Sequence, residues 1–383
     1  MNRKNVLLLG INGSIDIING IVDFTKDRGW NLMIEDRYAI PEMQMCDGII
    51  TTLLNRPNEI RFVRNAIRRG IPVVDINHEM SFRGLVRTTL DYSAAGQIAA
   101  EHFAERGFRR AAWFSMDAYH MHNLVQTGFE KAWRGEPPLK WTSNQNHDMR
   151  MFDKWLIKTL RTAPKPVAVL TFNTYNAFRL LNACISAGID VPNEISIISA
   201  SNETPYLDNV RSFTISYVAF DYSALGYEAA RTLELAMTRR LQKATTLLAP
   251  LGIHIGRSSN AYSAHDDRLR KALNFIHGNI AHTINAEDIA KHVGMSRVSL
   301  DRMFISELGA TTGKSILKLR INEARRMLSD SNMKLDVIAS AIGMCHASYL
   351  IKVFMREYGI TPTQFRRQSK FQNHSIRVAG SHF

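Results

Sequence analysis

The first two thirds of the chain alternate short apolar runs with stretches whose apolar residues recur every three or four positions. VLLLG at 6–10, DGIIT at 47–51 and IPVVDI at 71–76 are three such runs, and a helical pattern separates each from the next. A second round extends from VAVLTF at 167–172 to FTISYVAF at 213–220. Alternation of this kind is typical of βαβ units that build parallel sheets. Two rounds predict two α/β lobes.

The pattern changes after GRSSNAYSAHDD at 256–267, a polar stretch without periodicity that we interpret as a linker. Beyond the linker the apolar spacing is helical, and runs typical of strands disappear. We therefore predict a two-lobed α/β domain over 1–262 and an all-α domain over 263–383.

The all-α part contains an internal repeat. INAEDIAKHVG-MSRVSLDRMFISELG and LDVIASAIG-MCHASYLIKVFMREYG both read as a short helix, a Gly-Met turn and a second helix, with Gly294 and Gly343 49 residues apart. This arrangement predicts two helix-turn-helix units, at about 285–308 and 335–358, and a long amphipathic helix between them. In such a unit the second helix enters the major groove of DNA.

The distribution of charge agrees with a polyanionic partner for this end of the chain. The formal net charge is +13, and residues 265–383 hold 18 Lys and Arg against 10 Asp and Glu. The first 264 residues hold 30 basic and 25 acidic residues, so most of the excess lies in the predicted all-α domain. Double-stranded DNA is the partner that this concentration and the repeated motif together favour.

A closing G-x-T-P-x-x-F-R pattern identifies the C-terminal part as similar to the AraC/XylS family of transcriptional regulators. The pattern consists of Gly359, Thr361, Pro362, Phe365 and Arg366, and the resemblance covers about 268–368. It implies a DNA-binding domain with two helix-turn-helix units, a partnership with RNA polymerase, and activation rather than repression.

The resemblance also implies which side chains reach DNA. By motif position they are Arg297, Val298, Asp301 and Arg302 in the first unit, and Ala347, Ser348, Ile351 and Lys352 in the second. The second set has few long polar side chains, so we expect it to contribute more apolar contact and phosphate anchoring than base readout.

The α/β part resembles the periplasmic-binding-protein-like effector domain of the lac-repressor family over roughly 4–256. The stretches that carry the resemblance include GIPVV at 70–74, TTLDYSAAGQIAAEHFAERGF at 88–108 and FDYSALGYEAARTL at 220–233. The resemblance implies a homodimer and a small-molecule effector, such as a sugar, bound between the lobes near the carboxyl ends of the strands.

Charged residues that hold sugar hydroxyls in this family are missing here. Where sugar-binding members of the family have an Arg and two Asp residues, this chain has, by motif position, Val125, Thr174 and Ser201. We expect neutral contacts instead, and the candidate effector-binding positions are Asn12, His78, Val125, Asn173, Thr174, Ser201 and Asn202.

Three other interpretations stay open. GINGS at 10–14 with Glu35 loosely matches an NAD(P) site, but a third glycine is absent and Asp16 would oppose a pyrophosphate, so we predict no enzyme and no cofactor. The α/β part could have lost its ligand and serve only for dimerisation or for contact with another protein. A purely architectural DNA binder would leave the α/β part without a role.

The remaining composition indicates a cytoplasmic protein. No apolar run approaches the roughly 20 residues that span a bilayer, and no signal peptide opens the chain, so we expect no membrane partner. Cys46, Cys184 and Cys345 are odd in number and far apart, which supports neither disulfides nor a metal site.

Overall fold

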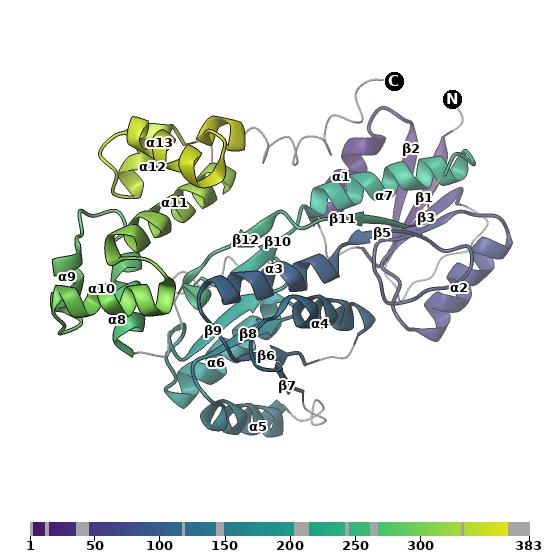
Figure 1. The fold of residues 1–383 in the computed structure, drawn as a ribbon. Coiled ribbons are helices and arrows are strands. Elements are labelled where there is room, and N and C mark those ends of the chain that lie inside the picture. Colours follow the sequence, from purple (N-terminus) through teal and green to yellow (C-terminus); the bar gives the residue numbers. More distant parts are fainter. Residues whose placement is uncertain are drawn as a thin grey trace. The chain divides into compact units, whose positions relative to one another are not determined.

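The computed structural model divides the chain into two compact units, residues 1–260 and 261–383 (Figure 1). The boundary falls within the polar stretch that the sequence marks as a linker. The structure describes residues 3–11, 15–35, 46–116, 119–142, 149–202, 214–241, 245–260, 267–330 and 333–366.

The first lobe of the α/β unit is a six-stranded sheet in the order β11-β5-β4-β3-β1-β2, in which every pair of neighbours is parallel. Its strands are β1 (Lys4–Leu9), β2 (Trp30–Glu35), β3 (Gly48–Thr51), β4 (Val73–Asp75), β5 (Val86–Leu90) and β11 (Thr245–Leu248). Its helices are α1 (Ile15–Thr25), α2 (Pro57–Arg68) and α7 (Tyr222–Met237).

The second lobe is a six-stranded sheet in the order β12-β10-β9-β8-β6-β7, parallel except for the β10–β12 pair. Its strands are β6 (Ala111–Phe114), β7 (Leu139–Trp141), β8 (Val167–Thr171), β9 (Ile195–Ser199), β10 (Ser216–Ala219) and β12 (Gly252–His254). Its helices are α3 (Tyr92–Glu105), α4 (His120–Ala132), α5 (Met149–Thr162) and α6 (Thr174–Ala187).

The chain crosses between the lobes three times, from β5 to α3, from β10 to α7 and from β11 to β12. This architecture confirms the predicted pair of α/β lobes. The fully buried strands β3, β6, β8 and β9 are the continuous apolar runs of the sequence, as expected of parallel strands that are covered on both faces.

Glycines bring two helix pairs into close contact in this unit. A Cβ atom on Gly96 of α3 would lie 2.0 Å from the Val125 carbonyl oxygen of α4. In return, a Cβ atom on Gly128 of α4 would lie 2.0 Å from the Ser93 carbonyl oxygen of α3. The α1–α7 pair of the first lobe is built in the same way around Gly20. Only glycine permits these backbone approaches.

The second unit is helical, as predicted. It consists of α8 (Asp267–Gly278), α9 (Ala286–His292), α10 (Arg297–Leu308), α11 (Thr312–Asp330), α12 (Leu335–Ala341) and α13 (Ala347–Tyr358). Its apolar side chains form two separate cores, one around Phe304 and one around Phe354, and α11 contributes to both. Among the helices described in either unit, none has the length and apolarity needed to cross a bilayer.

Candidate DNA-binding surface and effector site

Side-chain caps start both helices of the first repeated unit, and a glycine forms the turn of each unit. The Asn285 side chain accepts from the backbone of α9 in a capping box, and the Ser296 side chain accepts from Ser299 N to start α10. The turn glycines Gly294 and Gly343 have φ angles of 66° and 70°, a left-handed conformation that L side chains rarely adopt. The α9–α10 and α12–α13 pairs are therefore two copies of one helix-turn-helix motif.

The second helix of each unit buries equivalent positions. Leu300, Met303 and Phe304 of α10 lie in the first core, and Leu350, Val353 and Phe354 of α13 lie in the second. The remaining faces of both helices are exposed to solvent. Each unit therefore presents one unpacked helix face, as groove entry requires.

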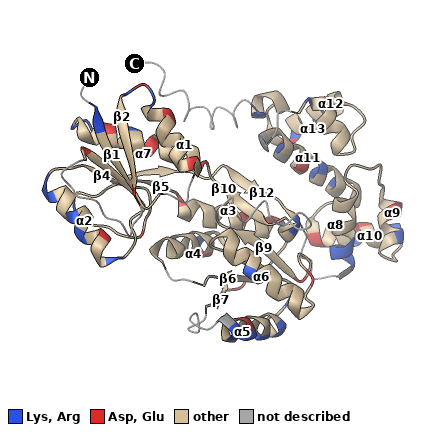
Figure 2. Cartoon of the chain, turned by 180° about the vertical axis from the view of Figure 1, so that it is seen from behind, with Lys and Arg blue, Asp and Glu red and all other residues tan. Residues whose placement is uncertain are grey.

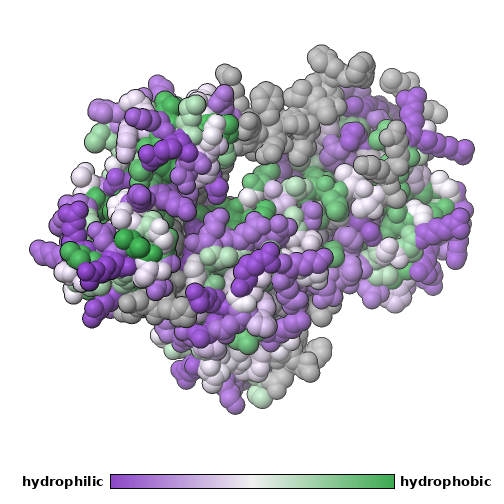
Figure 3. Space-filling model, in the orientation of Figure 1, coloured by the Kyte–Doolittle hydropathy of each residue, from purple (hydrophilic) through white to green (hydrophobic). Residues whose placement is uncertain are grey.

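The predicted DNA-facing residues of α10 differ in their exposure and in the contacts they already make within the protein. Val298 is 60% exposed, and Arg302 is exposed and forms no hydrogen bond or ion pair within the described part of the chain. Arg297 forms an ion pair with Glu287 on the surface. Exposed apolar side chains on this helix also include Ile305 and Leu308, and Figure 3 shows apolar residues among hydrophilic ones over this part of the molecule.

Asp301 has a structural role in addition to the predicted one. Its carboxylate accepts a hydrogen bond from Thr312 N at 3.0 Å, at the start of α11. Bonds from the side chain and backbone of Thr312 lower the pKa of Asp301. The side chain therefore caps α11, and its contact with DNA stays a prediction.

In α13, Ser348 and Lys352 are exposed, whereas Ala347 and Ile351 are half-buried. Tyr349 is 50% exposed in the first turn of this helix, and sequence reasoning missed it. An aromatic residue directly after two small ones, at the start of a predicted recognition helix, was the available signal. Lys and Arg residues are also frequent on α8 and α11 (Figure 2).

The closing sequence motif has a structural explanation. The Thr361 hydroxyl accepts from Gln364 N at 3.2 Å and begins a short final helical turn. The Phe365 ring packs 5.6 Å from the ring of Phe354, and Arg366 donates to the Met333 carbonyl oxygen at 2.6 Å. The motif thus closes the second core.

In the α/β unit, the positions without the expected charges are buried. Val125 lies in the hydrophobic core between α3 and α4, which corrects the expectation that it faces a ligand. Thr174 and Ser201 are also buried, and the Ser201 hydroxyl donates to the Phe172 carbonyl oxygen at 3.2 Å. Asn12 lies outside the described residues.

The two predicted amides have local hydrogen bonds. Asn173 caps α6 by accepting from Asn176 N at 2.9 Å. Asn202 accepts from Phe220 N at 2.8 Å and donates to the Phe220 carbonyl oxygen at 3.3 Å. The two Asn202 bonds hold the ends of β9 and β10 together.

Aromatic side chains gather near these strand ends. Phe172 follows β8 and stacks on His122 with 3.7 Å between ring centroids. Tyr92, at the β5–α3 crossover, lies 5.8 Å from Phe172 and 6.3 Å from Phe220 at the β10–α7 crossover. The His122 ring nitrogen Nδ1 lies 2.8 Å from the Ser115 hydroxyl. Phe172, Phe220 and His122 are buried, and Tyr92 is half-buried beside them, so this aromatic cluster packs the crossovers between the lobes.

His78 belongs to a direct contact between the lobes. Its ring lies 5.4 Å from that of His120, at the start of α4. The neighbouring Glu79 accepts from His120 N at 2.6 Å, whereas the N-cap residue of α4, Tyr119, makes no side-chain capping bond. A carboxylate of the first lobe thus caps a helix of the second. Burial, followed by the charges of Arg87 and His120, lowers the pKa of His78 to about 4.

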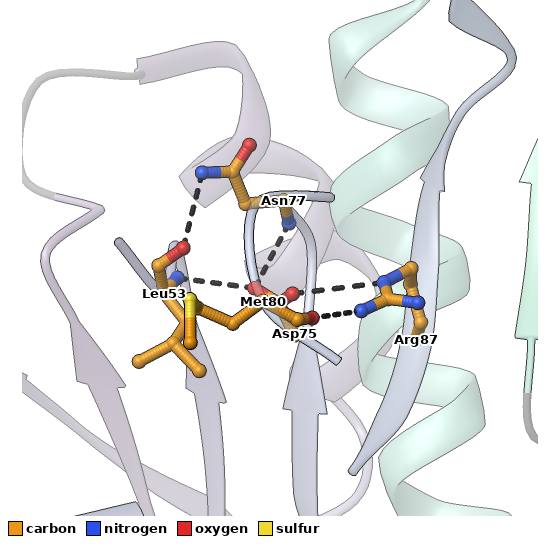
Figure 4. Close-up of polar contacts among 5 residues, drawn as sticks. All are labelled: Leu53, Asp75, Asn77, Met80 and Arg87. Carbon is orange, nitrogen blue, oxygen red and sulfur yellow. Dashed lines mark hydrogen bonds and ion pairs between the residues drawn. The ribbon is translucent and has the colours of Figure 1, made fainter. Parts of the chain in front are cut away.

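A buried Asp75–Arg87 pair supports the loop that carries this contact, and sequence reasoning missed it (Figure 4). Asp75 Oδ1 accepts from Leu53 N and Asn77 N, each at 3.0 Å, and Oδ2 lies 3.7 Å from Arg87 Nε. Arg87 also donates to the Met80 carbonyl oxygen. Burial raises the pKa of Asp75 to about 7, against the opposing effects of these hydrogen bonds and of Arg87.

No cluster of three or more His, Cys, Asp or Glu residues in the described ranges has the arrangement of a metal site. The α/β unit matches a periplasmic binding protein-like domain over residues 100–259, and the helical unit matches a helix-turn-helix domain over 289–368.

Relatives match both units together. The xylose operon regulatory protein of Haemophilus influenzae is 23% identical over 95% of this chain and 98% of its own length, and that of Escherichia coli K12 is 24% identical over 95% and 97%. Over nearly its whole length the chain resembles AraC-type transcriptional regulators. A solved structure of the xylose-binding transcription activator xylR shares its fold, with a TM-score of 0.61 and 19% identity over 96% of this chain and 99% of that one.

The α/β unit also has the fold of solved LacI-family regulators, such as one from Chloroflexus aggregans, which covers 67% of this chain and 98% of its own with a TM-score of 0.54 and 16% identity. A regulator from Lactococcus lactis, CcpA, covers 67% of this chain over all of its own, with a TM-score of 0.54 and 18% identity. Both predicted family resemblances are thereby confirmed. The curated relatives are regulators and not enzymes, which agrees with the interpretation that this chain has no enzymatic activity.

Proposed function

We propose that this regulator is a dimeric activator of a bacterial catabolic operon, and that a small molecule bound between the lobes of its α/β unit controls it. It acts in the cytoplasm on tandem half-sites, together with RNA polymerase. The main support for DNA binding is the pair of equivalent helix-turn-helix units, each of which has one exposed recognition-helix face. Two such helices suit successive major grooves, about 34 Å apart on one face of the duplex.

The proposed effector is a small neutral metabolite of the sugar type. The relatives that match the whole chain are named for xylose, so pentoses are the first class to test. Among the residues, support comes from Tyr92, a half-buried aromatic side chain at the β5–α3 crossover, since small-molecule sites are lined largely by apolar and aromatic side chains. The uncharged Thr174 and Ser201 are consistent with a ligand held without ion pairs.

Two substitutions in the recognition helices test the DNA-binding proposal. Arg302→Ala is expected to weaken binding to the selected operator by about 1–3 kcal/mol, with relaxed specificity, because the first recognition helix loses a base-reading cation. Lys352→Ala is expected to weaken binding to every sequence alike and to reduce the salt slope by about one unit, because it removes a phosphate contact. Affinity measured against salt concentration, on operator and on random DNA, separates the two effects.

The matched control is Lys154→Ala, which removes an exposed lysine of α5 in the α/β unit. It should leave both affinities unchanged. Wild-type affinity of the Arg302 and Lys352 variants across the salt series would contradict the proposed docking.

A second candidate function is a ligand-independent regulator, whose α/β unit only dimerises or contacts another protein. The contact between Glu79 and His120 N favours it, because the protein itself supplies a bond across the lobes. Closure would then need no effector.

Thermal unfolding of the full chain against pentoses, hexoses, sugar acids and less polar metabolites separates the two candidates. A ligand that binds the folded state at about 100 times its Kd adds about 2.7 kcal/mol to the free energy of unfolding, so the true effector raises the Tm in a concentration-dependent way. We expect a shift with a neutral pentose. No shift with any compound would instead support the ligand-independent candidate.

A further inference from the structure

The two recognition helices belong to separate hydrophobic cores. Ile316 of α11 lies in the first core, whereas Ile321, Ala324 and Leu328 of the same helix lie in the second. A helix shared by two cores can bend or twist unless a further contact braces it. The relation between α10 and α13 therefore depends on what joins the two halves besides α11.

Arg320 makes such a contact. It lies on α11 at the transition between the cores, and its guanidinium donates to the His282 carbonyl oxygen at 2.6 Å. His282 lies in the loop between α8 and α9, which belongs to the first half. The arginine thus ties α11 to the first half by a charge-assisted hydrogen bond.

The α12–α13 turn of the second half packs against the site where Arg320 meets the α8–α9 loop. A Cβ atom on Gly343 would lie 2.6 Å from the Ile280 carbonyl oxygen and 2.8 Å from Arg320 Nη2. The α12–α13 turn therefore approaches both the α8–α9 loop and the guanidinium of Arg320. Two requirements favour glycine at this position: its φ is +70°, and a side chain would not fit.

The start of the second recognition helix is near as well. Burial lowers the pKa of Arg320, and the proximity of Cys345 and Tyr349 opposes that effect. Cys345 lies in the turn, and Tyr349 in the first turn of α13. By geometry, one guanidinium therefore lies against both the loop of the first half and the turn that leads into the second recognition helix.

We propose that Arg320 is a positioning residue that fixes the spacing between the two recognition helices, so that the regulator selects operators by the distance between their half-sites. The proposal rests on the proposed DNA-binding function. Inserting one base pair between half-sites moves them about 3.4 Å apart and rotates them by about 35°, given a repeat of 10–10.5 base pairs over 34–36 Å. A braced pair of helices cannot follow that change, whereas an unbraced pair can.

The test begins with selection of binding sites from a random DNA pool by the full wild-type chain. The selected site is then remade with one base pair inserted or deleted between its half-sites, and as a single half-site. Affinities are measured for wild type, Arg320→Ala, Arg320→Lys and Gly343→Ala. Lys318→Ala is the matched control, because it removes an exposed cation of the same helix.

Wild type and the Lys318 variant should lose about tenfold or more in affinity when the spacing changes, as expected when one half-site is misplaced. When the spacing changes, Arg320→Ala should lose less than about threefold in affinity, and its affinity for a single half-site should be unchanged. The affinity loss of Arg320→Lys should lie between those of wild type and Arg320→Ala, because lysine keeps the charge but lacks the planar guanidinium with several donors. Gly343→Ala disturbs the brace from its other side and should also reduce the spacing penalty.

The proposal would be overturned if Arg320→Ala and Gly343→Ala both lost as much affinity as wild type when the spacing changes. An equal loss on single half-sites would do so too, because it would mean that Arg320 acts within one half. If wild type selects no sequence at all, the DNA-binding function fails, and that outcome is distinct from either result.

Discussion

Gly96→Ala lowers the free energy of unfolding of the α/β unit by about 3 kcal/mol or more. The added Cβ would lie 2.0 Å from the Val125 carbonyl oxygen and 2.6 Å from Phe129 N, both of them backbone atoms of α4. Backbone in a packed helix cannot move aside as a flexible side chain can, so α3 and α4 must separate and open the core around Phe103. Calorimetry or denaturant unfolding of the full chain measures the loss.

The control for this substitution is Gly278→Ala, at the end of α8. No atom lies within 4 Å of the added Cβ there, and alanine favours the helix by about 1 kcal/mol over glycine. The variant should be neutral or slightly stabilised. Equal stability of the Gly96 and Gly278 variants would show that the α3–α4 approach is looser than the structure indicates.

Asp75→Asn changes how the stability of the α/β unit depends on pH. The folded state raises the pKa of Asp75 from 3.8 to about 7, so it holds the proton more tightly than the unfolded chain does. Wild type therefore keeps this stabilisation at low pH and loses it as the pH rises from about 4 toward 7. A pKa difference of this size corresponds to about 4 kcal/mol. Asn cannot ionise and keeps the oxygen that accepts from Leu53 N and Asn77 N.

The expected result is that the stability of the Asn variant relative to wild type increases with pH by up to about 4 kcal/mol between pH 4 and pH 8. Unfolding at a series of pH values measures it, with the exposed Asp16→Asn as control. A difference that stays constant with pH, or falls, would mean that Arg87 holds Asp75 ionised in the folded protein.

The sequence predicted the parts of the fold whose signals are local. The apolar runs became the buried strands, and the repeat of Gly294 and Gly343 became two equivalent turns. The edge strands β7, β11 and β12 were not predicted. They are three or four residues long and mostly exposed or half-buried, so pairing with a neighbouring strand defines them rather than an apolar pattern of their own.

Site residues were harder to predict because position in a motif does not fix the direction of a side chain. Asp301 lies on the recognition helix, yet it turns to cap α11, and Val125 turns into the core. The missed Asp75–Arg87 pair and the Glu79–His120 contact join residues 12 and 41 positions apart. Such partners meet only through the tertiary fold.

Hydroxyl-radical footprinting of the full regulator on DNA selected from a random pool tests the central claim most directly. The account predicts, for each monomer, two protected segments on one face of the duplex, centred about 10.5 base pairs apart, and weaker protection of the first in Arg302→Ala. A single protected segment, or segments on opposite faces of the duplex, would contradict the claim that both helix-turn-helix units enter successive major grooves.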